Sequence, residues 1–179
     1  SILKTVNEIQ MPKNSTLIWG DIIASGRVGR GESFQFTRLH SLTKVKVDKK
    51  LVLYDNQLLS PKEQPISSLL FYEGYTHQAT LIYVSPFGNQ LKEELDEILN
   101  GQYKEITFGF TSCGENAVML RAMGKDGEKL YEWLTAMGRL CWEFTQHKLQ
   151  ESIQEPSEEV SQGPPVQTEK AQPLPEPVI

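Results

Sequence analysis

The stretch that decides the fold runs from residue 16 to residue 38 and reads TLIWGDIIAS (16–25), GRVGRGE (26–32) and SFQFTR (33–38). The first part is rich in β-branched residues and is apolar on both alternations, which predicts a strand covered on both faces. The second part contains three glycines, which permit positive φ or close backbone approach. The third part alternates apolar and polar residues, which predicts another strand. We therefore expect a strand, a glycine connection and a strand.

The sequence on the C-terminal side continues this β pattern. Lys and Val alternate over 43–47, residues 48–50 read as a turn, and 51–54 return, so we expect a hairpin with one side facing water. Further strands are predicted at 76–85, 105–112 and 117–123.

Two helices are predicted near the C-terminal end. The first is capped by Asn89 and stopped by Gly101, and the second starts at Asp126 and runs to about Leu149. The apolar residues of the first helix fall at helical spacing, at Leu91, Leu95, Ile98 and Leu99. Together these patterns predict roughly eight strands and two helices. We therefore expect a mainly β fold with an α+β end.

The last part of the chain differs in composition from the rest. Six of the ten prolines accumulate after residue 150 among Glu, Gln and Ser. Such a composition buries too little apolar area to offset chain entropy, so a disordered tail is expected. We therefore predict one β domain over 1–149 and a disordered Pro/Glu-rich tail over 150–179.

Charge and cysteine content narrow the classes of function. The net charge is −5, and residues 151–179 carry six Glu and one Lys, which is also −5, so the preceding part is neutral. A neutral body lacks the basic footprint that holds a phosphate backbone, so nucleic acid is not an expected partner. No apolar run is long enough to span a bilayer. Two cysteines, Cys113 and Cys141, are too few for a disulfide framework, which favours reduced thiols in the cytoplasm.

Several polar residues are candidates for chemistry. The glycines of 26–32 resemble a phosphate cradle, but the run lacks the Lys-Ser/Thr ending of a P-loop, so a backbone turn is the better interpretation. Arg27, Arg30 and Glu32 beside them face either a partner or one another as ion pairs, and both interpretations stay open. Asp21 and Asp55 interrupt apolar strands, where a carboxylate costs free energy unless water, a cation or a donor satisfies it. Exposure at a strand edge is the alternative.

The three histidines lie far apart in the sequence, and no HxxxH or CxxC spacing occurs, so a tightly ligated metal is not expected. No Gly-x-Ser-x-Gly elbow is present either. A small hydrolytic enzyme remains an alternative, with a cleft formed by Asp21, His77 and Cys113. A generic β scaffold for protein interactions is another.

The run 21–38, with its G-R-x-x-x-x-E-x-F-x-F-x-R pattern, together with LYDN (53–56) and GYTH (74–77), resembles the UreD family of urease accessory proteins, called UreH in some bacteria. The resemblance is strong over about 15–85 and looser over the two helices. Family members have a further β region upstream, and this chain starts at Ser1 without an initiator Met, so it looks like the C-terminal portion of such a protein.

The resemblance implies a stacked, helical β-structure and a function in nickel insertion into apo-urease, with no enzymatic activity. It implies three partners, namely the urease apoprotein subunits, UreF, and the GTPase UreG recruited through UreF. It also implies a polar passage for nickel in transit, without a tightly bound cofactor. By position, the metal-path candidates are Asp21, Glu32 and Asp55, and the partner-binding candidates are Arg27, Arg30, Arg38, Tyr75 and His77.

Overall fold

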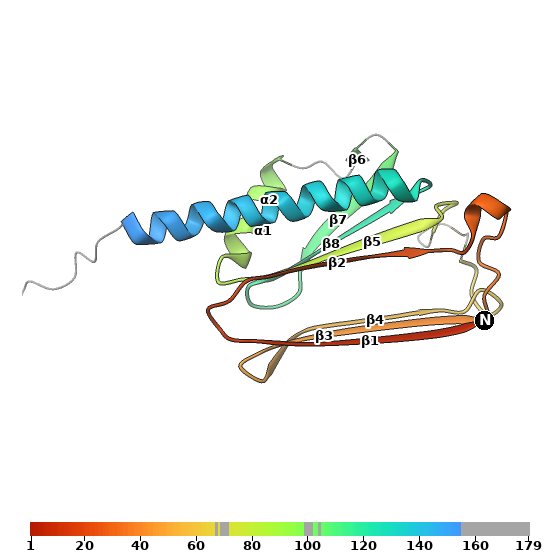
Figure 1. Cartoon of the computed structure of the whole chain (residues 1–179), viewed down its shortest axis with the longest axis horizontal. Coiled ribbons are helices and arrows are strands. Elements are labelled where there is room, and N and C mark those ends of the chain that lie inside the picture. Colours follow the sequence, from red (N-terminus) through yellow and green to blue (C-terminus); the bar gives the residue numbers. More distant parts are fainter. Residues whose placement is uncertain (67, 69–71, 99–101, 104, 155–179) are drawn as a thin grey trace, which may run out of the picture.

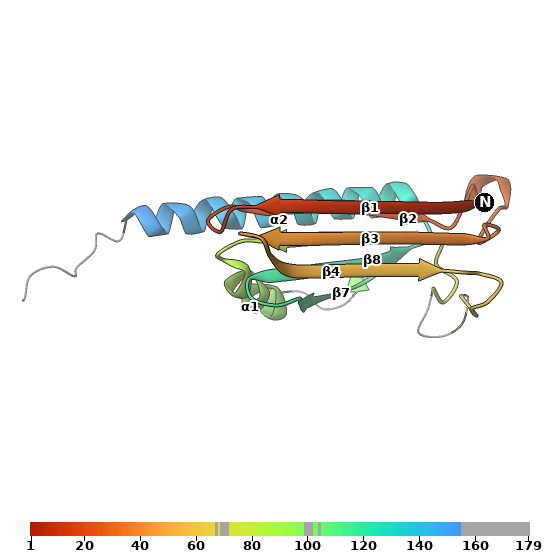
Figure 2. The same ribbon diagram turned by 90° about the horizontal axis from the view of Figure 1, so that it is seen from below.

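The part of the chain that the structure describes forms two stacked β-sheets, with two helices on the outer face of the larger sheet (Figures 1 and 2). The computed structural model describes residues 1–66, 68, 72–98, 102–103 and 105–154. The smaller sheet has the order β1-β3-β4 and the larger has the order β2-β5-β8-β7-β6. The mainly β fold with two helices toward the C-terminal end is confirmed.

The smaller sheet is formed by β1 (Ile2–Met11), β3 (Arg38–Val47) and β4 (Lys50–Leu59). The predicted hairpin is β3–β4, whose two turn residues Asp48 and Lys49 both have positive φ, 46° and 69°. This is the backbone that a two-residue hairpin needs. β1 was not predicted from the sequence, and it pairs parallel with β3 as one of the two edge strands of this sheet.

The larger sheet is formed by β2 (Leu17–Ala24), β5 (His77–Val84), β8 (Ala117–Gly124), β7 (Ile106–Ser112) and the short β6 (Gln102–Tyr103). The longer four were predicted, and β2 is covered on both faces as expected. Ile18 and Ile22 pack toward the helices, and Trp19 packs toward the smaller sheet.

The predicted strand at 33–38 is wrong, because β3 starts only at Arg38. Residues 26–37 form an irregular connection that contains a short 3-10 helix, η1 (Val28–Arg30). Phe34 has φ of 54°, and its ring packs edge-on against Tyr72 with the centroids 4.9 Å apart. Its N–H donates to the Ser25 carbonyl, 2.8 Å away. The aromatic alternation therefore serves a local cluster instead of a sheet.

Helix α1 (Gly88–Ile98) starts where it was predicted, but its first turn is arranged differently. Asn89 lies inside the helix, and the Ser85 hydroxyl accepts the Phe87 N–H at 3.3 Å. A Cβ on Gly88 would lie 2.3 Å from the Asn116 carbonyl oxygen, so only glycine allows α1 to start against the β7–β8 turn. The predicted stop at Gly101 lies outside the described residues.

Helix α2 (Gly127–Gln154) starts directly after Asp126, where it was predicted, and the structure adds that the Asp126 carboxylate caps it by accepting the N–H groups of Glu128 and Lys129. It extends five residues past the predicted end at Leu149. The remainder of the predicted tail, 155–179, lies outside the described residues. Across the described part of the chain, no helix is long and apolar enough to cross a membrane.

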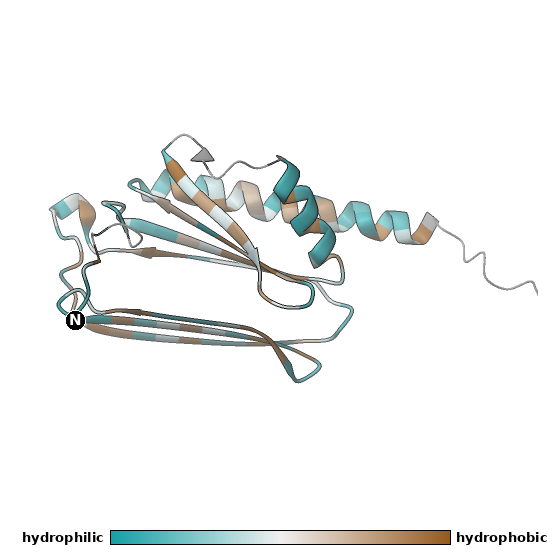
Figure 3. Cartoon of the chain, turned by 180° about the vertical axis from the view of Figure 1, so that it is seen from behind, coloured by the Kyte–Doolittle hydropathy of each residue, from teal (hydrophilic) through white to brown (hydrophobic). Residues whose placement is uncertain are grey.

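Three apolar clusters hold these layers together. One lies between the larger sheet and the helices and includes Tyr83, Leu120, Trp133 and Cys141. The other two lie between the sheets, one around Val45 and Ile82 and one around Leu39 and Tyr72. Hydrophilic and hydrophobic residues alternate along the strands (Figure 3), as expected when successive side chains face opposite sides of a sheet.

Candidate functional site

Two rows of polar residues face each other between the sheets. In the larger sheet, Asp21 of β2 pairs with Thr80 of β5, which pairs with Arg121 of β8. Residues paired directly across neighbouring strands share a face, so these three side chains form one row. The equivalent row in the smaller sheet is Asn7 of β1, Thr43 of β3 and Asp55 of β4.

One ion pair connects the two rows across the sandwich. Arg121 Nη2 donates to Asp55 Oδ1, with the Asp55 side chain 11% exposed and the Arg121 side chain 40% exposed. The other Asp55 oxygen accepts from Gln57 Nε2 at 2.9 Å, and Gln57 Oε1 accepts from Gln78 Nε2 at 2.6 Å. These contacts make a polar layer that is two residues deep along the strands.

Apolar residues bound this layer on both sides along the strands. In β4 the inward residues are Leu53, then Asp55 and Gln57, then Leu59. Leu53 belongs to one inter-sheet cluster and Leu59 to the other. The polar layer therefore crosses the sandwich transverse to the strands, between two hydrophobic walls.

Asp21 is the least satisfied charged group in the layer. Burial and the nearby Asp55 carboxylate raise the pKa of Asp21 from 3.8 to about 6, and Arg121 partly offsets them. Asp21 Oδ1 is buried without a hydrogen-bond partner among the described residues. When all three groups are ionised, two carboxylates face one guanidinium, so one negative charge is left over.

Other buried polar atoms near this position also lack partners within the described part of the chain. They are Thr80 Oγ1, Arg121 Nε and the Tyr72 hydroxyl. Burial raises the pKa of Tyr72 to about 12, and the charges of Arg121 and Asp21 act on it in opposite directions. Unsatisfied buried groups cost about 1–3 kcal/mol each, which indicates a layer suited to water or a cation.

Glu32, the third predicted metal-path residue, is not part of this layer. It lies in the 26–37 connection and forms a two-point ion pair with Arg27, with N–O distances of 2.7 and 2.8 Å. Of the two interpretations left open for these side chains, the structure shows the intramolecular ion pair. No group of three or more His, Cys, Asp or Glu side chains is arranged to hold a metal among the residues that the structure describes.

The five predicted partner-binding residues lie at one end of the sandwich, the end with η1 and the N-terminus (Figure 1). Arg27, Arg30 and Arg38 are exposed there. Tyr75 is half-buried and its hydroxyl bonds to Thr107 Oγ1 at 2.7 Å. His77 Nδ1 bonds to Thr76 Oγ1 at 2.9 Å, and its ring lies against Gly127 at the start of α2. Arg30 and Arg38 are thus available, whereas Arg27 is paired with Glu32 and His77 is held by the fold.

The residues of the alternative hydrolytic site do not converge. The Cys113 N–H bonds to the carbonyl of Ala117, which is paired with Val84 at one end of β5, whereas His77 is at the other end. Seven strand residues at about 3.4 Å each separate these ends by roughly 24 Å. Burial also raises the pKa of the Cys113 thiol, which disfavours the reactive thiolate.

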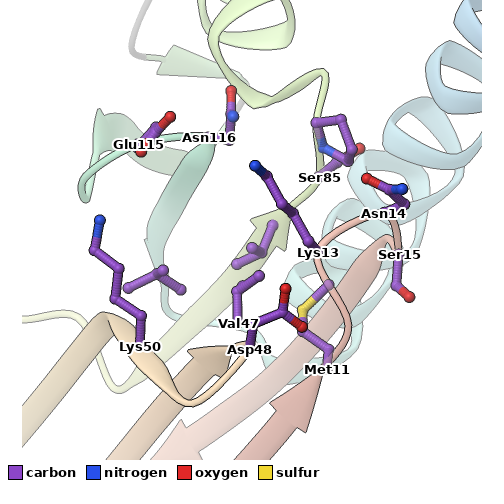
Figure 4. Close-up of a pocket in the computed structure, with 13 residues that line it drawn as sticks. Met11, Lys13, Asn14, Ser15, Val47, Asp48, Lys50, Ser85, Glu115 and Asn116 are labelled. Atoms are coloured by element: carbon purple, nitrogen blue, oxygen red, sulfur yellow. The ribbon is translucent and has the colours of Figure 1, made fainter.

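A pocket of about 390 Å³ opens at the opposite end from the arginines (Figure 4). Lys13, Asp48 and Lys50 stand at its rim, and Val84 lines it from the cluster that bounds the polar layer. None of the residues predicted as site residues line it.

Arg121, the counter-charge of the site, was not among the residues predicted from the sequence. The available signal was an arginine inside the apolar strand AVMLRAMG, the same anomaly that singled out Asp21. The two glutamines and the two threonines of the layer gave no such signal, because these residues are common on strand surfaces.

Comparison with known proteins agrees with the resemblance and extends it. The model of the UreD urease accessory protein family matches residues 1–157. UreD of Flavobacterium johnsoniae is 35% identical over 148 residues, which cover 79% of this chain and 52% of the relative. UreD of Acetivibrio thermocellus is 31% identical over 69% of this chain and 47% of its own. UreH of Helicobacter pylori strain J99 is 30% identical, with 79% and 52% covered. The chain spans about half the length of these relatives.

Proposed function

Because the chain belongs to the UreD family of urease accessory proteins, we propose that it acts in urease maturation as a scaffold for nickel insertion into apo-urease. In this proposal the chain catalyses no reaction, works in the cytoplasm and handles nickel as cargo. Its partners are the urease apoprotein subunits and UreF, with UreG recruited through UreF.

The main support for the nickel proposal is that Asp21 and Asp55 lie close together in one polar layer between the sheets. Carboxylates are hard oxygen donors that hold Ni(II) more weakly than imidazole or thiolate does, which suits transit better than storage. The surplus negative charge of the layer attracts a divalent cation, and the unpartnered oxygens of Asp21 and Thr80 offer it ligands.

The layer also provides a direction for transit. It runs from Asn7 and Asp21 on the edge strands β1 and β2 to Arg121, whose side chain is 40% exposed. The hydrophobic walls on either side disfavour a charged ion, because an unpaired charge in an apolar environment is strongly destabilised. A cation crossing the sandwich would therefore follow the polar rows.

We assign partner contact to a surface outside the polar layer, namely the exposed arginines at the η1 end of the sandwich. Arg30 and Arg38 present planar donor forks to solvent, a geometry that matches carboxylates on another protein. Because these arginines lie outside the polar layer, we expect that partner binding and nickel transfer can be disrupted by different substitutions.

The test is coexpression of the full chain with the urease subunits and the other accessory proteins, comparing wild type with Asp21→Asn/Asp55→Asn. Nickel-dependent urease activity should fall tenfold or more, while the copurified yield with urease and UreF stays near wild type. Glu32→Gln is the matched control, because it removes a carboxylate outside the layer.

The competing function is a generic β interaction scaffold in which the two aspartates only satisfy neighbouring donors. It predicts that yield and activity fall together in the double variant, or that neither changes. Either outcome would remove the nickel path and leave the family role.

A further inference from the structure

A line of exposed apolar residues runs along one flank of α2, next to the side of the helix that packs on the larger sheet. It comprises Tyr131 (63% exposed), Trp142 (55%), Leu149 (45%) and Ile153 (81%), with Gly138 between the first two. The spacings 7, 4, 7 and 4 keep these residues on one side of a helix that turns about 100° per residue. We call this line the α2 stripe. It extends over about 33 Å at 1.5 Å per residue.

Single exposed apolar residues need no explanation, but a collinear set whose spacings of 7 and 4 residues are close to two turns and one turn of helix marks a surface suited to packing against another helix. The core side of α2 is already covered, because Leu130, Trp133 and Cys141 are buried against the larger sheet. The α2 stripe is therefore a second apolar surface of the same helix, and it has no cover from the described part of the chain.

Gly138 indicates which kind of surface packs on the α2 stripe. Glycine inside a helix is about 1 kcal/mol less favourable than alanine, yet the fold itself does not require it here. A Cβ at Gly138 would find its nearest neighbour, Ile18 Cγ2, at 3.9 Å, which is ordinary van der Waals contact. The glycine leaves a notch in the stripe one turn before the protruding indole of Trp142.

A notch and a protruding indole four residues apart on one surface are complementary to the same surface turned end to end. When two such helices pack antiparallel about a two-fold axis near residue 140, each Trp142 lies over Gly138 of the other copy, and each Tyr131 lies against Leu149. We propose that two copies of this chain associate through the α2 stripe in this register.

Sedimentation analysis of the full chain from about 1 to 100 µM tests the proposal. We expect a monomer–dimer equilibrium that Trp142→Glu weakens at least 100-fold. Ala136→Glu is the control, because it adds the same charge at an exposed position of α2 outside the stripe and should change the dissociation constant less than twofold.

Gly138→Ala separates association from folding. It fills the notch and should weaken the dimer about tenfold, while the thermal midpoint of the monomer rises because alanine favours the helix. In a Cys113→Ser background, a mixture of Tyr131→Cys and Leu149→Cys chains should form the mixed disulfide, whereas neither variant should crosslink with itself.

A monomer at 100 µM, or a dimer equally sensitive to Trp142→Glu and Ala136→Glu, would overturn the proposal. So would a monomer whose copurification with UreF is abolished by Trp142→Glu, because that result assigns the stripe to a helix of a different protein.

Discussion

The two faces of the larger sheet are formed by alternate residues of the same strands, but they differ in whether their buried polar groups have hydrogen-bond partners. On the helix side, the buried Tyr83 hydroxyl bonds to Thr145 Oγ1 at 2.9 Å, and Thr145 donates to the Cys141 carbonyl at 2.7 Å. On the side facing the smaller sheet, Asp21 and Thr80 each carry a buried oxygen without a partner among the described residues.

This difference indicates that the helix face stabilises the fold and the inter-sheet face serves another purpose. A satisfied apolar layer contributes to stability roughly in proportion to its buried area. A half-satisfied charged layer is less stable than an apolar one of the same shape. Retaining it between two hydrophobic clusters is consistent with a functional role for Asp21, Asp55 and Arg121.

The largest effect is expected on the helix face. Leu120 is 1% exposed beneath the helices, so Leu120→Ala should lower the free energy of unfolding by about 3 kcal/mol through lost burial and a residual cavity. Urea denaturation at pH 7 measures this change. A loss below 1 kcal/mol would mean that this face is less closely packed than the contacts show.

An intermediate effect of opposite sign is expected in the polar layer. Because the folded-state pKa of Asp21 is raised from 3.8 to about 6, the folded protein binds this proton more tightly, and the Asp21 contribution to stability falls as pH rises from about 4 to above 6. The shift corresponds to about 3 kcal/mol at 1.36 kcal/mol per unit, which screening by residual solvent reduces to about 1–2 kcal/mol.

Asp21→Asn should therefore stabilise the protein by about 1–2 kcal/mol at pH 8 and change its stability little at pH 4, where the wild-type carboxyl is already neutral. Parallel urea titrations at both pH values measure the difference. Equal effects at pH 4 and pH 8 would contradict the raised pKa and the repulsion from Asp55.

The smallest effect is expected at Thr80, which is 1% exposed. Thr80→Val keeps the shape and removes the unpartnered hydroxyl, so it should stabilise the protein by about 0.5–1 kcal/mol. Thermal unfolding followed by circular dichroism is sufficient to detect it. Destabilisation of 1 kcal/mol or more would show that the hydroxyl bonds to a structural water, and the contrast between the faces would then be weaker.

Periodicity alone located most of the elements. The β2 run, the β3–β4 hairpin, β5, β7, β8 and both helix starts followed from local patterns, because the side-chain periods of strands and helices are encoded in neighbouring residues. The same patterns singled out Asp21 and Asp55 as carboxylates in apolar strands. The family followed from the residues of 21–38 and is supported by the comparisons.

Only the tertiary structure decided which residues meet. A strand pattern says which side chains share a face but not which sheet lies opposite, since that depends on non-local packing. Hence the sequence could not place Asp55 of one sheet against Arg121 of the other, or separate Glu32 from both aspartates by pairing it with Arg27. Packing also overrode the alternation at 33–37, where the ring contact of Phe34 with Tyr72 replaces strand pairing.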